Sequence, residues 1–165
     1  MGMTLVRLVA RPMLSAMFIT GGLNAVKNAR PLAERARPVT DRLAPAVERA
    51  TKSLPFDVDP VMMVRANGVV QVAAGSMLAT GRMPRLASLA LAGTLVGTTL
   101  GGHRYWEETD PTTKANQRVH FFKNVSMMGG LLLAAVDTEG RPGLAWRAKH
   151  QASRAKKSVA GLTSH

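Results

Sequence analysis

Four stretches of the chain are mostly apolar, and basic or polar segments separate them. They cover approximately residues 8–26, 61–80, 86–100 and 119–136. The second stretch has about the length that an α-helix needs to cross the hydrocarbon core of a bilayer. The pattern predicts an all-α protein, a bundle of four transmembrane helices with both chain ends on one side of the membrane.

The third and fourth stretches are shorter, so a soluble helical bundle is the alternative. Helices of a soluble bundle are amphipathic, whereas residues 86–100 carry no charged side chain on any face. Gly93, Gly97 and Gly101 recur at every fourth position of this stretch. Their spacing indicates either close helix association of the GxxxG type or the ordinary frequency of glycine in membrane helices.

The linker between the first two spans, residues 29–58, is basic and amphipathic. Val39, Leu43 and Val47 lie four positions apart, so they share one face of a helix, while Arg42 and Arg49 lie on other faces. Two interpretations stay open. The linker is either a solvated loop helix or a helix on the bilayer surface with its arginines at the lipid phosphates.

The charge of the chain changes the choice of partners. Its 165 residues include 22 Lys and Arg against 10 Asp and Glu, a net charge of +12. Such an excess suits either nucleic acid or an anionic membrane surface. Only four Phe, two Trp and one Tyr could stack on bases, and no nucleic-acid motif is present. We therefore expect membrane lipids and other protein subunits as partners, and no nucleic acid.

The predicted membrane domain covers residues 1–140, and residues 141–165 form a basic tail. Lys and Arg are nearly balanced between the two sides of the membrane, so their count gives little direction. Most acidic residues fall in the loops opposite the chain ends, and a basic tail in the cytoplasm needs no translocation. We expect a multi-pass protein of the bacterial inner membrane with both termini in the cytoplasm.

Lys123 lies inside the fourth span, where a cation is expensive in lipid. His120 and Asn124 project from neighbouring faces of the same helix, and Arg65 comes from the second span. These four residues could line an inward polar pocket for a quinone headgroup, a lipid phosphate or a small oxyanion. The alternative is that Lys123 extends to the membrane surface and pairs with a carboxylate of residues 107–110.

The absence of cysteine excludes disulfides, thiol catalysis and thiolate metal ligands. The four histidines show no metal-ligand spacing, so no metal site is predicted. No set of catalytic residues emerges, and we expect a chain that is not catalytic on its own. No cofactor is evident apart from a quinone at the Lys123 pocket.

Residues 103–137, HRYWEETDPTTKANQRVHFFKNVSMMGGLLLAAVD, resemble the DoxX family of small bacterial membrane proteins. An aromatic-rich loop with an Asp-Pro pair leads into a helix with a Phe-Lys-Asn core and a Gly-Gly-Leu-Leu end. The first span is similar too, through Arg11, Phe18, Gly21 and Asn24. The resemblance implies a four-helix membrane bundle, to which the basic linker looks like an addition.

The family name is linked to quinone-reducing thiosulfate oxidoreductases, and some members to membrane complexes that handle oxidative or thiol stress. The resemblance therefore implies an accessory or interaction subunit of such a complex, which docks redox partners through its basic surfaces. The alternative is a quinone-linked oxidoreductase subunit with a headgroup site around Lys123.

Overall fold

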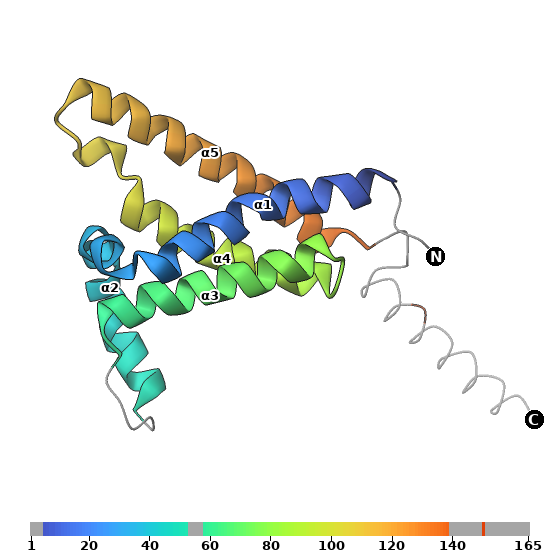
Figure 1. Cartoon of the computed structure of the whole chain (residues 1–165), viewed down its shortest axis with the longest axis horizontal. Coiled ribbons are helices and arrows are strands. Elements are labelled where there is room, and N and C mark those ends of the chain that lie inside the picture. The colour runs from blue at the N-terminus through green and yellow to red at the C-terminus, as the bar shows by residue number, and fades with distance from the viewer. Residues whose placement is uncertain (1–4, 53–57, 139–149, 151–165) are drawn as a thin grey trace, which may run out of the picture.

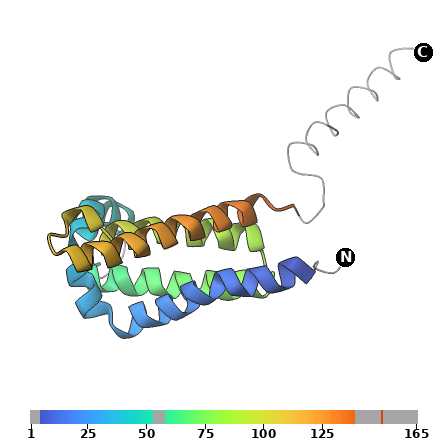
Figure 2. The ribbon, with the colours of Figure 1, turned by 90° about the horizontal axis from the view of Figure 1, so that it is seen from above.

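A computed structural model describes residues 5–52, 58–138 and 150, and all elements in these ranges are helices (Figure 1). Viewed from above, α1 and α3 form one pair and α4 and α5 the other, while α2 lies at one end of the bundle (Figure 2). The prediction of an all-α fold is confirmed. The elements are α1 (Leu5–Lys27), α2 (Ala29–Thr51), α3 (Pro60–Ala79), α4 (Pro84–Gly102), the short 3-10 helix η1 (Tyr105–Glu107) and α5 (Pro111–Val136).

Two long helices begin at an Asp-Pro pair. The side chain of Asp59 accepts a hydrogen bond from the backbone N–H of Met62 at 2.6 Å, and that of Asp110 from Thr113 at 2.7 Å. The following proline lacks an N–H, so the first turn has one donor fewer to satisfy. The bond from the Thr113 N–H also lowers the pKa of Asp110, because it favours the carboxylate. The last helix therefore begins well before residue 119, where the fourth span was expected.

A tight turn between α3 and α4 reverses the chain. Gly81 has a φ of 70° and Met83 a φ of 49°, and Pro84 then opens α4. The left-handed region favours glycine, so Met83 is an unusual residue for this conformation. The turn is too short for the chain to leave α3, and α4 packs antiparallel to it.

The backbones of α1 and α3 are in direct contact through glycines. A Cβ atom on Gly22 would lie 2.6 Å from the carbonyl oxygen of Gly68, and one on Gly68 would lie 2.7 Å from that of Gly22. Farther along α3, a Cβ atom on Gly75 would lie 2.9 Å from Cγ1 of Ile19. Close approach of this kind is how helices associate in lipid, where burial of apolar surface gives little drive between them.

The core lies between the two helix pairs. Leu78 of α3, Leu91 of α4 and Leu131 of α5 are fully buried, and Phe18 of α1 packs against the same cluster. Most other large apolar side chains point away from this core. In the most apolar windows of α1, α3 and α5 only 22%, 28% and 17% of the residues are buried, so the outer surface of the bundle is hydrophobic.

Three of the four expected spans, α1, α3 and α5, have the length and composition of membrane-crossing helices. The fourth, α4, is not among them; it contains Arg85, Ser88 and three threonines. A water-soluble bundle would not expose so much apolar surface. The protein is therefore an all-helical membrane protein.

The linker forms a helix from Ala29 to Thr51, and its first half packs on the bundle. Ala33 and Thr40 are buried, and the Cβ position of Gly101 lies 3.6 Å from Ala36. Farther along, Leu43 is 46% exposed. The expected tail, residues 141–165, lies outside the described residues except for His150, so the division at residue 140 stays a prediction.

The glycine contact can be tested with alanine. Gly68→Ala should destabilise the protein by about 1–3 kcal/mol, because the new methyl group meets the backbone of α1. Gly93→Ala is the matched control, since a Cβ there meets nothing within 4 Å and alanine favours helix. Thermal unfolding in mild detergent measures both. Equal stability of the two variants would contradict the contact.

Candidate functional site

Three of the four predicted site residues lie close together on α5. The Nζ of Lys123 lies 3.3 Å from Nδ1 of His120, on the outer side of the helix. Asn124 is only 4% exposed and points inward, where its Nδ2 donates a hydrogen bond to Oγ1 of Thr99 at 3.0 Å. The helix thus carries the two basic side chains outward and the amide into the contact with α4.

Arg65 lies elsewhere. It is exposed on α3 and lines an open depression together with Asp59, Met62 and Val69, and no residue of α5 lines that depression. The structure therefore does not bring Arg65 together with the other three residues. Ligand binding by the four as one pocket stays a prediction.

The expected pairing of Lys123 with the loop carboxylates is wrong. Glu107 accepts a hydrogen bond from Arg104 at 3.1 Å, and Asp110 caps α5. Within the described ranges no carboxylate lies within ion-pair distance of Lys123. Its partner is His120, whose Nδ1 lies within hydrogen-bond distance of the Lys123 ammonium group.

A second histidine extends this cluster. The rings of His103 and His120 stack with their centroids 5.1 Å apart, and Nδ1 of His103 lies 2.7 Å from Oε1 of Gln117. At the same end of the bundle, Tyr105 and Trp106 of η1 pack against Phe121 of α5, with ring centroids 5.5 and 5.8 Å from its ring. We call His103, Gln117, His120 and Lys123 the corner cluster. It joins hydrogen-bonding groups to aromatic rings where α4 leads into α5.

The contact between α3 and α4 holds a second polar group. Oγ1 of Thr98 accepts hydrogen bonds from Nε2 of Gln71 at 3.2 Å and from Nδ2 of Asn67 at 3.4 Å. Gln71 is buried, but Thr98 is exposed on the outside of the bundle. Farther round α4, on the outside of the bundle, Cβ atoms on Gly93 and Gly97 would meet nothing within 4 Å. We call Asn67, Thr98, Gly93 and Gly97 the α3–α4 face.

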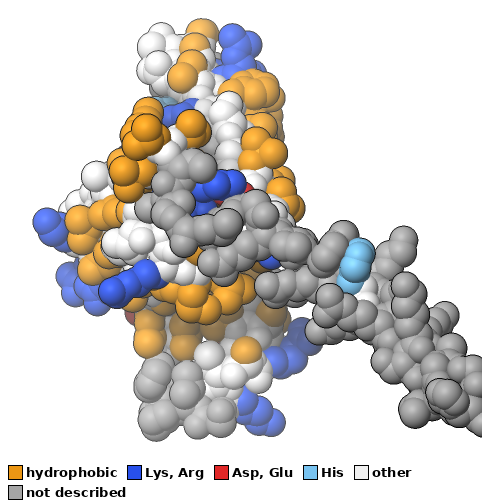
Figure 3. Space-filling view, turned by 90° about the vertical axis from the view of Figure 1, so that its right-hand side faces the viewer, with side chains coloured by type: hydrophobic (Ala, Val, Ile, Leu, Met, Phe, Trp, Pro, Cys, Tyr) orange, Lys and Arg blue, Asp and Glu red, His pale blue; other side chains and the backbone are white. Residues whose placement is uncertain are grey.

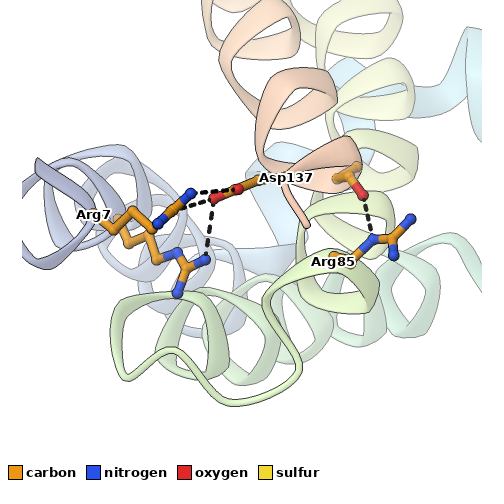
Figure 4. Close-up of polar contacts among 5 residues, drawn as sticks. Arg7, Arg85 and Asp137 are labelled. Carbon is orange, nitrogen blue, oxygen red and sulfur yellow. Dashed lines mark hydrogen bonds and ion pairs between the residues drawn. The ribbon is translucent and has the colours of Figure 1, made fainter. Parts of the chain in front are cut away.

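At the opposite end of the bundle, Asp137 ties the last long helix to the first (Figure 4). Arg7 donates to both of its carboxylate oxygens, from Nε at 2.7 Å and Nη2 at 2.9 Å, and Nη2 of Arg11 lies 3.5 Å away. Arg11 is only 5% exposed. Nearby, Nε of Arg85 donates to the carbonyl oxygen of Ala135 at 2.8 Å, so α4 is tied to α5 as well.

Sequence reasoning missed this ionic cluster, although a signal for it existed. Four predicted spans would bring the start of the first helix and the end of the last to one side, which is where Arg7, Arg11 and Asp137 stand in the sequence. Figure 3 views this end, where basic side chains stand beside a wide hydrophobic surface. A bidentate arginine–carboxylate pair in such surroundings is a strong structural link.

The chain belongs to the DoxX family, because the family model matches residues 6–104, more than half of its length. No curated protein and no solved structure matches the chain. The match covers α1 to α4, including the resemblance noted at Arg11, Phe18, Gly21 and Asn24. Nearly all of residues 103–137, where the resemblance was described first, lies beyond it, so the corner cluster is mostly outside the matched part.

The ionic cluster generates a stability prediction. Asp137→Asn keeps the shape of the side chain but removes the negative charge facing Arg7 and Arg11, so we expect a loss of about 1–3 kcal/mol. Glu107→Gln is the control, because its pair with Arg104 is half exposed and such pairs contribute about 0–1 kcal/mol. Thermal unfolding of the detergent-solubilised variants measures both. A harmless Asp137→Asn would show that the cluster is not a structural link.

Proposed function

We propose that this DoxX-family protein crosses the membrane four times and acts as an accessory or interaction subunit of a redox or oxidative-stress-related membrane complex. The redox setting is an expectation that comes with the family. The single observation that carries the interaction role is the α3–α4 face, which presents polar groups and bare backbone on the outside of the bundle.

The packing of α4 supports a fourth crossing. It is 19 residues long, which corresponds to about 28 Å of helix. It follows α3 through a tight turn and packs along both α3 and α5, so it passes through the same depth as its neighbours. Its three threonine hydroxyls donate to backbone carbonyls, Thr94 to Leu91, Thr98 to Thr94 and Thr99 to Leu95, whereas the buried hydroxyl of Ser88 has no hydrogen-bond partner among the described residues. Satisfied hydroxyls cost much less in lipid than free ones.

For the orientation, we propose the inner membrane with both termini in the cytoplasm. Arg7, Arg11, Arg82 and Arg85 lie at the end of the bundle where α1 begins and α5 ends. The only acidic residue in the described part of that end is Asp137. Acids are more frequent at the other end, in α2 and around η1. The balance supports the cytoplasmic placement of the more purely basic end.

The α3–α4 face supports the interaction role because its polar groups cost free energy when they are exposed to lipid. Within the described residues the Oδ1 of Asn67 accepts no hydrogen bond, and Thr98 is exposed. Polar groups at a lipid-facing position are stabilised when another helix brings a hydrogen-bonding side chain. Farther round α4, the open backbone at Gly93 and Gly97 lets a helix approach α4 closely. The partner that fits is a transmembrane helix of another subunit with small residues and a donor.

The interaction role is tested by native purification. We expect a stoichiometric membrane partner with the wild type, and about a tenfold lower yield of it with Gly93→Leu combined with Gly97→Leu, which corresponds to about 1.4 kcal/mol. Gly129→Leu is the matched control, because its Cβ position on α5 is also open. Mass spectrometry of the purified complex gives the ratio. A partner retained in full by the double variant would overturn the role of this face.

The alternative function is that of a quinone-linked oxidoreductase subunit, and the corner cluster favours it. The Nζ of Lys123 is a donor for a carbonyl oxygen, and the stacked rings of His120 and His103 place flat surfaces next to it. Tyr105, Trp106 and Phe121 form an aromatic group at the same end of the bundle. A donor next to flat surfaces suits a quinone headgroup. The electron donor would lie in another chain.

Extraction of bound lipids tests this alternative. If it holds, the purified wild type carries a quinone and Lys123→Ala loses most of it, while Lys114→Ala keeps it. Lys114 is a fair control because it lies on the same helix and is exposed. Chromatography of the organic extract measures the amount. Equal amounts in both variants would exclude a headgroup site at Lys123.

A further inference from the structure

All but the last two residues of the helix α2 form three tandem units of seven residues. Residues 29–35, 36–42 and 43–49 read ARPLAER, ARPVTDR and LAPAVER. Each unit has proline at its third position, an acid at its sixth and arginine at its seventh. Because seven residues make nearly two turns of α-helix, equivalent positions fall on one line that drifts by only about 20° per unit. Arg35, Arg42 and Arg49 therefore form a row with a spacing of about 10.5 Å.

The apolar positions of the units form a second row, and the bundle covers only part of it. In the first two units Ala29, Ala33 and Thr40 are buried. In the third unit Leu43 is 46% exposed and Val47 is half-buried, and Ala50, just beyond the unit, is exposed. The apolar row thus continues past the part of α2 that packs on α3 and α4.

The arginine row borders this apolar row, and the acids and prolines lie farther round the helix. Glu34 pairs with Arg37, 3.1 Å from its Nε, which belongs to the other flank. Arg49 donates from Nε to the carbonyl oxygen of Pro45 at 3.0 Å, which holds its stem along the helix. In the described part of the chain, neither Arg35 nor Arg42 forms an ion pair.

The position of α2 decides what these two rows can meet. It lies at the end of the bundle where α1 and α4 end and α3 begins (Figure 1). If the long helices cross the membrane, as proposed above, this end is at the level of the lipid headgroups. An exposed apolar row beside a row of cations at that depth is the arrangement of a helix that lies in the membrane surface.

We infer that the third unit of α2 inserts its apolar row into the bilayer surface and that Arg35, Arg42 and Arg49 bind the phosphates of anionic phospholipids. The guanidinium group offers paired donors to phosphate oxygens, and each cation near an anionic surface adds to the attraction. The first two units hold α2 on the bundle, so the third is presented at a fixed height. The inference rests on the proposed crossing of the long helices but not on a protein partner.

A single cysteine makes this testable, because the chain has none of its own. Full-length Leu43→Cys, labelled with an environment-sensitive fluorophore, is placed in nanodiscs of phosphatidylglycerol or phosphatidylcholine with brominated acyl chains. We expect quenching at least about twofold stronger in the anionic discs. A label on Glu48→Cys, which lies toward the outer side of the helix, should stay in water and be quenched little.

The arginine row is tested against a variant of equal charge. In the Leu43→Cys background, the triple variant Arg35→Gln, Arg42→Gln and Arg49→Gln should lose the extra quenching in anionic discs. The matched triple variant Arg30→Gln, Arg37→Gln and Lys52→Gln removes the same charge from other positions and should retain it. If both triple variants lose the extra quenching equally, the net charge of α2 and not the arginine row causes it, and the inference is overturned.

Two further outcomes separate this inference from the proposed function. If the protein enters the discs but the Leu43 label remains in water with both lipids, α2 is a solvated helix and only the present inference fails. The present inference alone also fails if the label enters an apolar environment only in the native complex, because a protein then covers the third unit. If the protein does not enter the discs at all, the crossing helices of the proposed function fail with it.

Discussion

The bare surfaces of Gly22 and Gly68 let the backbones of α1 and α3 touch, and the remaining helices are arranged around that pair. Lipid tails are as apolar as the side chains of the helices, so burying these side chains gives little drive for helices to associate. Close packing and polar contacts must therefore hold the helices together. The tight turn at Gly81 then places α4 beside α3, and α5 completes the second pair. The ion pair between Arg7 and Asp137 closes the bundle by joining its first and last long helices.

The two ends of the bundle differ in their chemistry. One end has arginines gathered around Asp137 and the last turn of α5, an arrangement that serves to hold helices together. The other has two stacked histidine rings, the amide of Gln117 and Lys123, and within the described residues Lys123 pairs with no carboxylate. Charges that are matched within the fold stabilise it, whereas donors left facing outward are suited to bind something else. For this reason a ligand is proposed at the corner cluster and not at the ionic cluster.

The sequence predicted the helical class and the approximate position of each long helix, because long apolar runs are the strongest signal in a membrane protein. It missed the start of α5, since the turns between Pro111 and residue 119 lie outside the apolar run and show only the local Asp-Pro signal. Contacts between helices were harder to predict than the helices themselves. Gly93, Gly97 and Gly101 drew attention through their spacing, yet Gly101 meets α2 and the other two face outward. The contact that matters joins Gly22 to Gly68, on different helices, and Lys123 was given the wrong partner for the same reason.

The tandem units of α2 have a consequence for how this linker can vary in length. Removing or adding one whole unit would shift the end of the helix by about 10.5 Å along its axis and rotate it by only about 20°. The apolar and arginine rows would stay in line. A change of three or four residues would instead break the order of prolines and arginines. The length of α2 can therefore change in steps of one unit with its rows kept in line, without redesign of α1 and α3, which it joins.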